Sequence, residues 1–295
     1  MNRVQRTDNK EFIELQTKVR LGVWDKETET AFRNREGAVL PPAPQEGNEE
    51  KNYCPFLVTK SITRYLLEQR KLRFMCAACP DDSLLPIVVF AHMRARKTVA
   101  KLTPEEKTYL LGLPDNLLTK VPAWSAHYPG AWGMITTNLN VPCGLGQGTR
   151  GREVGWPEFP PDTTFTVKEF NGARVRIASA DPTCIFFEIT STGFRAVPEG
   201  QPKGLPPSVV ALPMHDNRSA VVDLSKMPGT KQRKSVALKM KQLPVRPANA
   251  LTTYSVHQST QFQRLVIFEA TPSEFYTQVS RSQNGLTHIS FARPL

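Results

Sequence analysis

The sequence has few cysteines and no long apolar run. Its five cysteines in 295 residues are an odd number, which argues against a disulfide framework. No apolar stretch approaches the roughly 20 residues that a membrane helix needs. Residues 1–6 also lack the apolar core of a signal peptide. We therefore expect a soluble, intracellular protein with no membrane partner.

Motifs for binding metals or phosphates are equally scarce. Cys76 and Cys79 form one C-x-x-C pair, but no second pair at a similar spacing is visible. Zinc or redox use and ordinary buried thiols stay open as interpretations of this pair, and we predict no metal site. No G-x-x-x-x-G-K-[ST] motif occurs. The glycines of residues 144–151 lack that ending and a following helix, so they predict tight turns.

Positive charge, in contrast, is in excess. The chain has 38 lysines and arginines against 27 acids, a formal charge of +11 that suits a polyanionic partner. Residues 226–246 contain no acid and seven basic residues: Lys226, Lys231, Arg233, Lys234, Lys239, Lys241 and Arg246. This basic run fits a surface that follows phosphates. A solvated loop or a nuclear-import-like patch is the alternative.

The apolar pattern of the first half predicts helices around a short strand. Asp8 and Glu11 resemble a capping box for a helix over about 9–20, which Gly22 ends. A strand over 56–58 precedes a helix over 61–72. Thr103 as N-cap, followed by proline and two acids, predicts a third helix that ends near residue 112.

The middle of the chain is rich in strand signals. Residues 163–168 and 174–177 alternate around Asn171-Gly172, a strong hairpin signal. Residues 184–189 add a third strand, and residues 198–213 read as a loop with five prolines. We interpret this region as a small β-barrel or meander.

The last fifty residues predict a parallel sheet covered by a helix. An apolar strand over 265–268 is followed by a helix over 273–281, with Ser273 as N-cap, and by a strand over 286–291. Strand ends in such sheets carry ligand-binding residues, which places Arg281 for chemistry rather than packing.

Several of these segments carry a family resemblance. Residues 252–258 and 276–282 resemble, in order and spacing, the last two motifs of the Pif/RecD-like superfamily-one DNA helicases, and are similar to those of Helitron transposon helicases. Residues 130–140 and 144–151 resemble a strand and a glycine turn of the same family. The resemblance covers nearly the whole chain but only the C-terminal half of a complete helicase.

The resemblance implies a fold and its domains. It implies an α/β fold in which residues 1–115 and 246–295 form the second RecA-like domain. Residues 116–245 would be an inserted, small SH3-like β-barrel subdomain that carries the basic loop.

The resemblance also implies roles for single residues. Arg281 would be the arginine finger that reaches the nucleotide γ-phosphate, and Arg6 and Gln258 would contact the nucleotide. A surface arginine near the chain end is the alternative for Arg6. We assign contacts with single-stranded DNA to family-like positions and to the basic run: Asn138, Thr252, His257, Lys231, Arg233, Lys234, Lys239 and Lys241.

Half of the ATP site of a helicase is missing from this sequence. ATP and Mg would bind only if a first RecA-like domain, with its Walker motif, were supplied by a partner. Residues 255–258 also lack the lysine and glycine of the family's Lys-Ser-Gln-Gly motif. The sequence thus favours a truncated or degenerate helicase that binds DNA and is inactive alone.

Two other functions stay open. One is a non-enzymatic module that binds single-stranded nucleic acid, and the other is a β-rich interaction protein. A nuclear location follows only from the transposon resemblance.

Overall fold

The chain folds into two compact units. The computed structural model describes residues 9–38, 53–95, 101–118, 121–190, 193–216, 220–229, 233–255, 262, 264–268, 270–282 and 288–292. The terminal unit combines residues 1–64 with residues 249–295, and the inserted unit spans residues 65–248. The inserted unit therefore begins at Tyr65 and ends at Ala248. The predicted domains, with bounds at residues 116 and 245, stay predictions.

The terminal unit contains a parallel sheet of four strands. Its order is β15 (Ala250–Thr252), β1 (Phe56–Val58), β16 (Leu265–Ile267) and β17 (Ile289–Phe291), and every neighbouring pair is parallel. The inner strand β1 carries two fully buried residues, Leu57 and Val58. Continuous apolar strands are typical of parallel sheets that are covered on both faces. The predicted parallel sheet and the predicted α/β class are confirmed.

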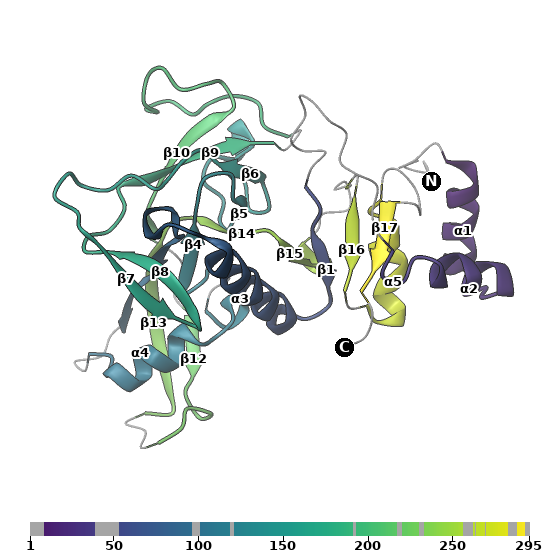
Figure 1. The fold of residues 1–295 in the computed structure, drawn as a ribbon, viewed down its shortest axis with the longest axis horizontal. Coiled ribbons are helices and arrows are strands. Elements are labelled where there is room, and N and C mark those ends of the chain that lie inside the picture. The colour runs from purple at the N-terminus through teal and green to yellow at the C-terminus, as the bar shows by residue number, and fades with distance from the viewer. Residues whose placement is uncertain are drawn as a thin grey trace. The chain divides into compact units, whose positions relative to one another are not determined.

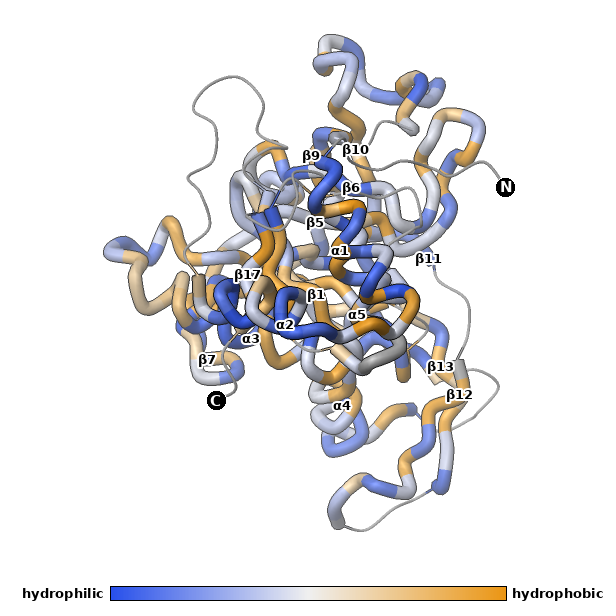
Figure 2. The backbone as a smooth tube through the Cα atoms, turned by 90° about the vertical axis from the view of Figure 1, so that its right-hand side faces the viewer, coloured by the Kyte–Doolittle hydropathy of each residue, from blue (hydrophilic) through white to orange (hydrophobic). Residues whose placement is uncertain are grey.

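Three helices belong to this sheet: α1 (Lys10–Arg20), α2 (Lys26–Arg33) and α5 (Pro272–Val279). Figure 1 shows α1 and α2 beside α5, and Figure 2 shows apolar and polar segments alternating along α1. The N-cap of α1 is Asn9, whose side chain accepts a hydrogen bond from the backbone N–H of Phe12. The predicted cap Asp8 lies outside the described residues. Thr271 caps α5, so the predicted cap Ser273 lies inside the helix instead.

An aromatic cluster joins these helices to the sheet edge. The ring of Phe32 on α2 lies 5.1 Å from that of Phe275 on α5 and 5.7 Å from that of Phe291 on β17. Trp24 stacks on Phe32 at 5.5 Å. Edge-to-face and offset stacked rings add stabilisation beyond the area that they bury. The cluster therefore fixes α2 and α5 against β17.

The inserted unit is built from three sheets of mostly antiparallel strands. The first has the order β10 (Val209–Pro213), β9 (Cys184–Ile189), β6 (Arg150–Glu153), β5 (Trp132–Ile135) and β14 (Val245–Pro247). The second joins β4 (Trp124–His127), β2 (Ile87–Phe90), β8 (Ala173–Ala178) and β7 (Phe165–Phe170). The third contains β11 (His215–Asp216), β13 (Ser235–Gln242) and β12 (Ala220–Asp223), with β3 (His92–Ala95) paired to β13.

Two helices and four short 3₁₀ turns complete the described elements. Helix α3 (Ser61–Ala78) starts in the terminal unit and continues into the inserted unit, and α4 (Pro104–Leu111) lies wholly in the inserted unit. The short turns are η2 (Asp82–Leu84), η3 (Asp115–Leu117), η4 (Val141–Cys143) and η5 (Thr253–Ser255). None of the helices within the described residues is long and apolar enough to cross a membrane.

The strongest local sequence signals in the inserted unit, for a helix cap and for tight turns, are confirmed by the structure. Thr103 and Glu106 form a complete capping box at the start of α4. Asn171 and Gly172 both have positive φ, at 51° and 72°, and join β7 to β8 in the predicted hairpin. Gly144 has a φ of 85°, and a Cβ there would meet the carbonyl oxygen of Gly193 at 2.1 Å, so this turn requires glycine.

Four expectations about the elements were wrong. Helix α3 continues past the predicted end at residue 72 to Ala78. Residues 209–213, expected in a loop, form strand β10 because they pair with β9 and are largely buried. Strand β9 does not extend the β7–β8 hairpin but joins β6 and β10 in another sheet. The basic run is not only loop, since β13 occupies eight of its residues.

Candidate nucleic-acid interface

The strands β3 and β13 carry a set of exposed basic side chains. They pair so that Lys239 stands opposite Arg94 and Lys241 opposite His92. Both lysines are exposed, whereas Met240 between them is fully buried. Opposed residues of two paired strands point to the same face. Arg94, Lys239 and Lys241 therefore share one exposed face, and we call these three residues the basic strip.

The basic strip places like charges against each other. Arg94 and Lys239 are direct cross-strand partners, an arrangement that lowers sheet stability. One acid is close by, since an Oδ2 of Asp216 lies 3.4 Å from Nζ of Lys239, and both side chains are more than half exposed. Exposed pairs of this kind contribute at most about 1 kcal/mol. The strip thus keeps a positive potential that a phosphate chain would neutralise.

Arg233 in the same basic run has a different environment. Its Nε and Nη2 donate hydrogen bonds to both carboxylate oxygens of Glu106, at 2.8 and 2.7 Å. Glu106 is only 1% exposed, and the hydrogen bond from Arg233 lowers the pKa of its carboxyl in spite of burial. The same bond raises the pKa of Arg233. The guanidinium that we assigned to DNA is therefore held by an internal carboxylate of α4.

Arg246, the last residue of the run, is held in a similar way. Its Nη1 donates to Oδ2 of Asp115 at 2.8 Å, and the Asp115 side chain is 5% exposed. Each arginine thus joins the run to a segment more than 120 residues earlier in the chain. Lys226 and Lys234 are exposed, outside the strand. Lys231 lies outside the described residues.

Asn138 has a local structural contact. Its Oδ1 accepts a hydrogen bond from the backbone N–H of Gln147 at 2.8 Å, which closes the glycine-rich turn that follows β5. The residue is exposed. Its assigned contact with DNA stays a prediction.

The terminal unit has a buried polar network where β1 and β15 end. Nε2 of Gln278 donates to Oγ1 of Thr253 at 2.8 Å, and this hydroxyl donates to the carbonyl oxygen of Val58 at 3.3 Å. Thr252 is also buried, and its hydroxyl shares a hydrogen bond with that of Ser255. The network ties α5 to the carboxyl ends of two parallel strands, where ligands bind in open α/β sheets.

Arg281 lies at a different point of the same unit. Its carbonyl oxygen accepts from the backbone N–H of Phe262 at 2.7 Å, and Phe262 packs against Tyr53. Both aromatic residues precede their strands, so the backbone of Arg281 lies beside the amino ends of the strands. The residue is 4% exposed. We expected Arg281 at a ligand-binding strand end; its role as an arginine finger stays a prediction.

Besides Lys231, three further assigned residues cannot be placed. Arg6, His257 and Gln258 lie outside the described residues. The nucleotide contacts assigned to Arg6 and Gln258 and the DNA contact assigned to His257 therefore stay predictions that come from the family resemblance alone.

The C-x-x-C pair lies at the end of α3. Cys76 is buried, and burial raises the pKa of its thiol to about 11, while all five cysteines are free. Within the described ranges no three His, Cys, Asp or Glu side chains gather in a way that could hold a metal ion. Of the two interpretations left open, the geometry of Cys76 fits a buried thiol.

The sequence did not reveal a buried chain of three polar side chains. Nε2 of His127 lies 2.6 Å from Oγ of Ser125, and its Nδ1 lies 2.8 Å from Oε1 of Glu153. This resembles the order of a serine hydrolase triad. Ser125, however, is 0% exposed, so no substrate reaches its hydroxyl. The three hydrogen-bonded side chains link β4 to β6. Their only signal in the sequence was the Ser-x-His spacing, which puts both side chains on one face of β4.

Burial of this chain also affects its acid. Desolvation raises the pKa of Glu153, while His127 and the backbone N–H of Tyr128 oppose that rise. A carboxyl group without these partners would be costly to bury. The three side chains therefore serve as an internal polar link.

The comparisons with known proteins concern structure only. No family model and no curated protein matches the chain. Among solved structures, the chain is similar to the Pif1 helicase from Candida albicans, with a TM-score of 0.57 and 14% identity over 99% of this chain and 55% of that chain. It is also similar to the Bacteroides Pif1 bound to ssDNA, with a TM-score of 0.57 and 13% identity over 99% of this chain and 51% of that one.

These matches identify the fold. A third structure, Bacteroides Pif1 in complex with ADP-AlF3 and ssDNA, gives the same TM-score of 0.57 at 12% identity. The chain spans about half the length of the solved structures that it matches. The predicted RecA-like α/β fold is thereby confirmed, and the SH3-like barrel form of the insertion stays a prediction.

Proposed function

We propose that this chain is the strand-binding half of a Pif1-like DNA helicase. The observation that carries the proposal is the basic strip on β3 and β13, where exposed cations stand directly opposite each other. Such an arrangement lowers sheet stability in the free protein and becomes favourable when phosphates lie along it. Two of the similar structures were solved with ssDNA, which supports single-stranded DNA as the ligand.

Binding through the strip would be electrostatic and insensitive to base sequence. Each phosphate that a lysine or arginine neutralises releases a counterion, so affinity falls steeply with salt. Lys234, which precedes β13, is a further exposed cation of the basic run. The finer parts of the proposal are a truncated helicase of Helitron type and a nuclear location, and both rest on the sequence resemblance.

The motor function would need a second component. The sequence contains no Walker motif, so ATP and Mg would bind only with a first RecA-like domain from a partner. In that assembly Arg281 would stabilise the charge that develops on the transferred phosphate. Arg281→Ala should then abolish most of the ATP turnover that a Walker-containing helicase half gains from this chain.

The first test is binding of single-stranded DNA, measured by fluorescence anisotropy at two salt concentrations, with ATP turnover assayed on the same sample. The proposal predicts salt-sensitive binding without turnover by this chain alone. Binding that does not change with salt, or no binding, would refute it. Turnover above background that Arg281→Ala removes would refute the inactive half and indicate a complete nucleotide site.

The alternative is a non-enzymatic module that binds single-stranded nucleic acid. It shares the strip and its salt dependence with the first proposal. The two proposals differ in what happens when a Walker-containing partner is added. Only if this chain is the strand-binding half of a helicase should the mixture show ATP turnover that depends on Arg281. Unchanged turnover in that mixture favours the non-enzymatic module.

A further inference from the structure

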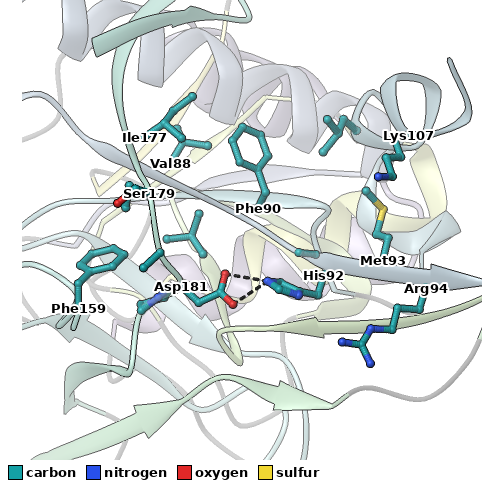
Figure 3. A pocket seen from close by; sticks show the side chains of 16 residues that line it. Val88, Phe90, His92, Met93, Arg94, Lys107, Phe159, Ile177, Ser179 and Asp181 are labelled. Carbon is teal, nitrogen blue, oxygen red and sulfur yellow. Dashed lines mark hydrogen bonds and ion pairs between the residues drawn. The ribbon is translucent and has the colours of Figure 1, made fainter. Parts of the chain in front are cut away.

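The inserted unit contains a cleft whose lining, apart from Arg94, takes no part in the assignments above. It has a volume of about 620 Å³ and lies between the β2–β3 segment, α4 and the chain that follows β8. Clefts of this size are typical of small-ligand sites. Figure 3 shows Phe90, Phe159 and Ile177 among its apolar side chains.

Charged side chains stand around this apolar lining. Arg94 from β3 and Lys107 from α4 are exposed cations that line the cleft. Nε2 of His92 lies 2.7 Å from the carboxylate of Asp181, and both residues of this pair line the cleft (Figure 3). The combination of aromatic rings with two cations matches a nucleotide, which has a flat base and a charged phosphate.

The cleft is continuous with the basic strip. Arg94 lines the cleft and is also the cross-strand partner of Lys239, and His92 is the partner of Lys241. A strand whose phosphates lie on the strip therefore passes directly by the cleft. A base that leaves the stack at this point meets Phe90 and Phe159 instead of water.

We propose that this cleft accepts one unstacked nucleobase of the strand bound along the basic strip, with the adjacent phosphate held by Arg94 and Lys107. The inference rests on the proposed function, because it needs a bound strand. Stacking on aromatic side chains is tolerant of base identity, so the site would add affinity without sequence preference.

The experiment compares two labelled single strands of equal length, one of thymidines and one of abasic nucleotides, at the same salt concentration. Both have the same phosphates, and only the first has bases. Wild-type protein should bind the thymidine strand about tenfold more tightly, since one stacked base is worth that much in comparable sites.

Two variants and one control locate the effect. Phe159→Leu keeps an apolar side chain but removes the ring, and it should reduce the preference to about twofold while binding of the abasic strand stays unchanged. Lys107→Gln should weaken the binding of both single strands. Lys203→Gln changes an exposed lysine of the same unit that lies outside the cleft and the strip, and it should alter neither.

Each other outcome has a defined meaning. Equal salt-dependent binding of both strands by the wild type would overturn the base site and leave the proposed function intact. No binding of either strand would overturn both. A preference that persists in Phe159→Leu would place the base elsewhere. If free thymidine monophosphate displaced the strand at equal concentration, the ligand would be a free nucleotide and the proposal would be wrong.

Discussion

Arginines and lysines of the same basic run are used in opposite ways. Arg233 and Arg246 each bind a carboxylate that is almost fully buried, whereas Lys239 and Lys241 project from the exposed face of β13. The arginine guanidinium binds a carboxylate with two parallel hydrogen bonds, and the lysine ammonium is a hydrated point charge. Total positive charge therefore overestimates the charge that is available to bind a polyanion, because some of the basic side chains form internal ion pairs that stabilise the fold.

The largest effect should come from breaking an arginine pair. Arg233→Met leaves the Glu106 carboxylate buried without its cation, which should lower the free energy of unfolding by roughly 3 kcal/mol. Urea unfolding at neutral pH measures this change. If the arginine acts only inside the fold, single-stranded DNA should bind the folded variant with the affinity of the wild type.

The matched control removes the charge on the other side. Glu106→Gln keeps the capping box of α4, since glutamine serves at this position as well. Arg233→Met should cost much less in the Glu106→Gln background, because no buried anion is left unpaired. An equal cost in both backgrounds would show that the ion pair is not the cause.

The second effect concerns the strip. Arg94→Ala, Lys239→Ala and Lys241→Ala together should weaken binding of single-stranded DNA about tenfold at 0.1 M salt, because three phosphate contacts are lost. Fluorescence anisotropy measures the affinity. Stability should hold or rise slightly, since a like-charged cross-strand pair is removed. Unchanged affinity would contradict the assignment of the strip.

A third, smaller effect appears on acidification. The pKa of Glu106 is lowered from its ordinary value of 4.5 mainly by its hydrogen bonds with Arg233. Because this pKa is lower in the folded than in the unfolded state, the ionised carboxylate stabilises the fold at pH values above the unfolded pKa. This stabilisation is lost as the pH falls through the folded pKa. The stability difference between wild type and Glu106→Gln should therefore shrink below about pH 4.5. Urea unfolding at pH 7 and at lower pH tests this, and a constant difference would contradict it.

The smallest effect should come from the acid beside the strip. Asp216 lies near Lys239 and opposite Lys241, so it opposes phosphate binding. Asp216→Asn should raise the affinity for single-stranded DNA about twofold at low salt. Asp162→Asn changes another exposed acid of the inserted unit and serves as the control. Equal gains in both variants would indicate a general charge effect rather than one at the strip.

Local signals in the sequence predicted much of the fold. The capping box of Thr103, the Asn171-Gly172 turn and the apolar strand β1 each depend on residues close together in the chain, and each was found. Strand β10 was missed because the prolines and glycines of the segment that leads into it are typical of a loop. Only pairing with β9, about 25 residues earlier, makes it a strand.

The candidate site was predicted less well, for the same physical reason. A sequence shows that residues 226–246 are basic, but it does not show that Glu106 and Asp115 lie against two of them. Nor does it show that Arg94 and His92 stand beside Lys239 and Lys241, since β3 and β13 are far apart in the chain. The Ser125–His127–Glu153 link depends on a similar long-range contact between β4 and β6.

The salt dependence of single-stranded DNA binding tests the central claim most directly, measured in parallel for the wild type, Arg233→Met and the pair Lys239→Ala with Lys241→Ala. If the lysines bind phosphates and the arginine does not, Arg233→Met keeps the wild-type slope of log affinity against log salt. The lysine pair should reduce that slope by about 1.4, or 0.7 for each phosphate contact on a single strand. An unchanged slope in the lysine pair, or a reduced slope in folded Arg233→Met, would contradict the account.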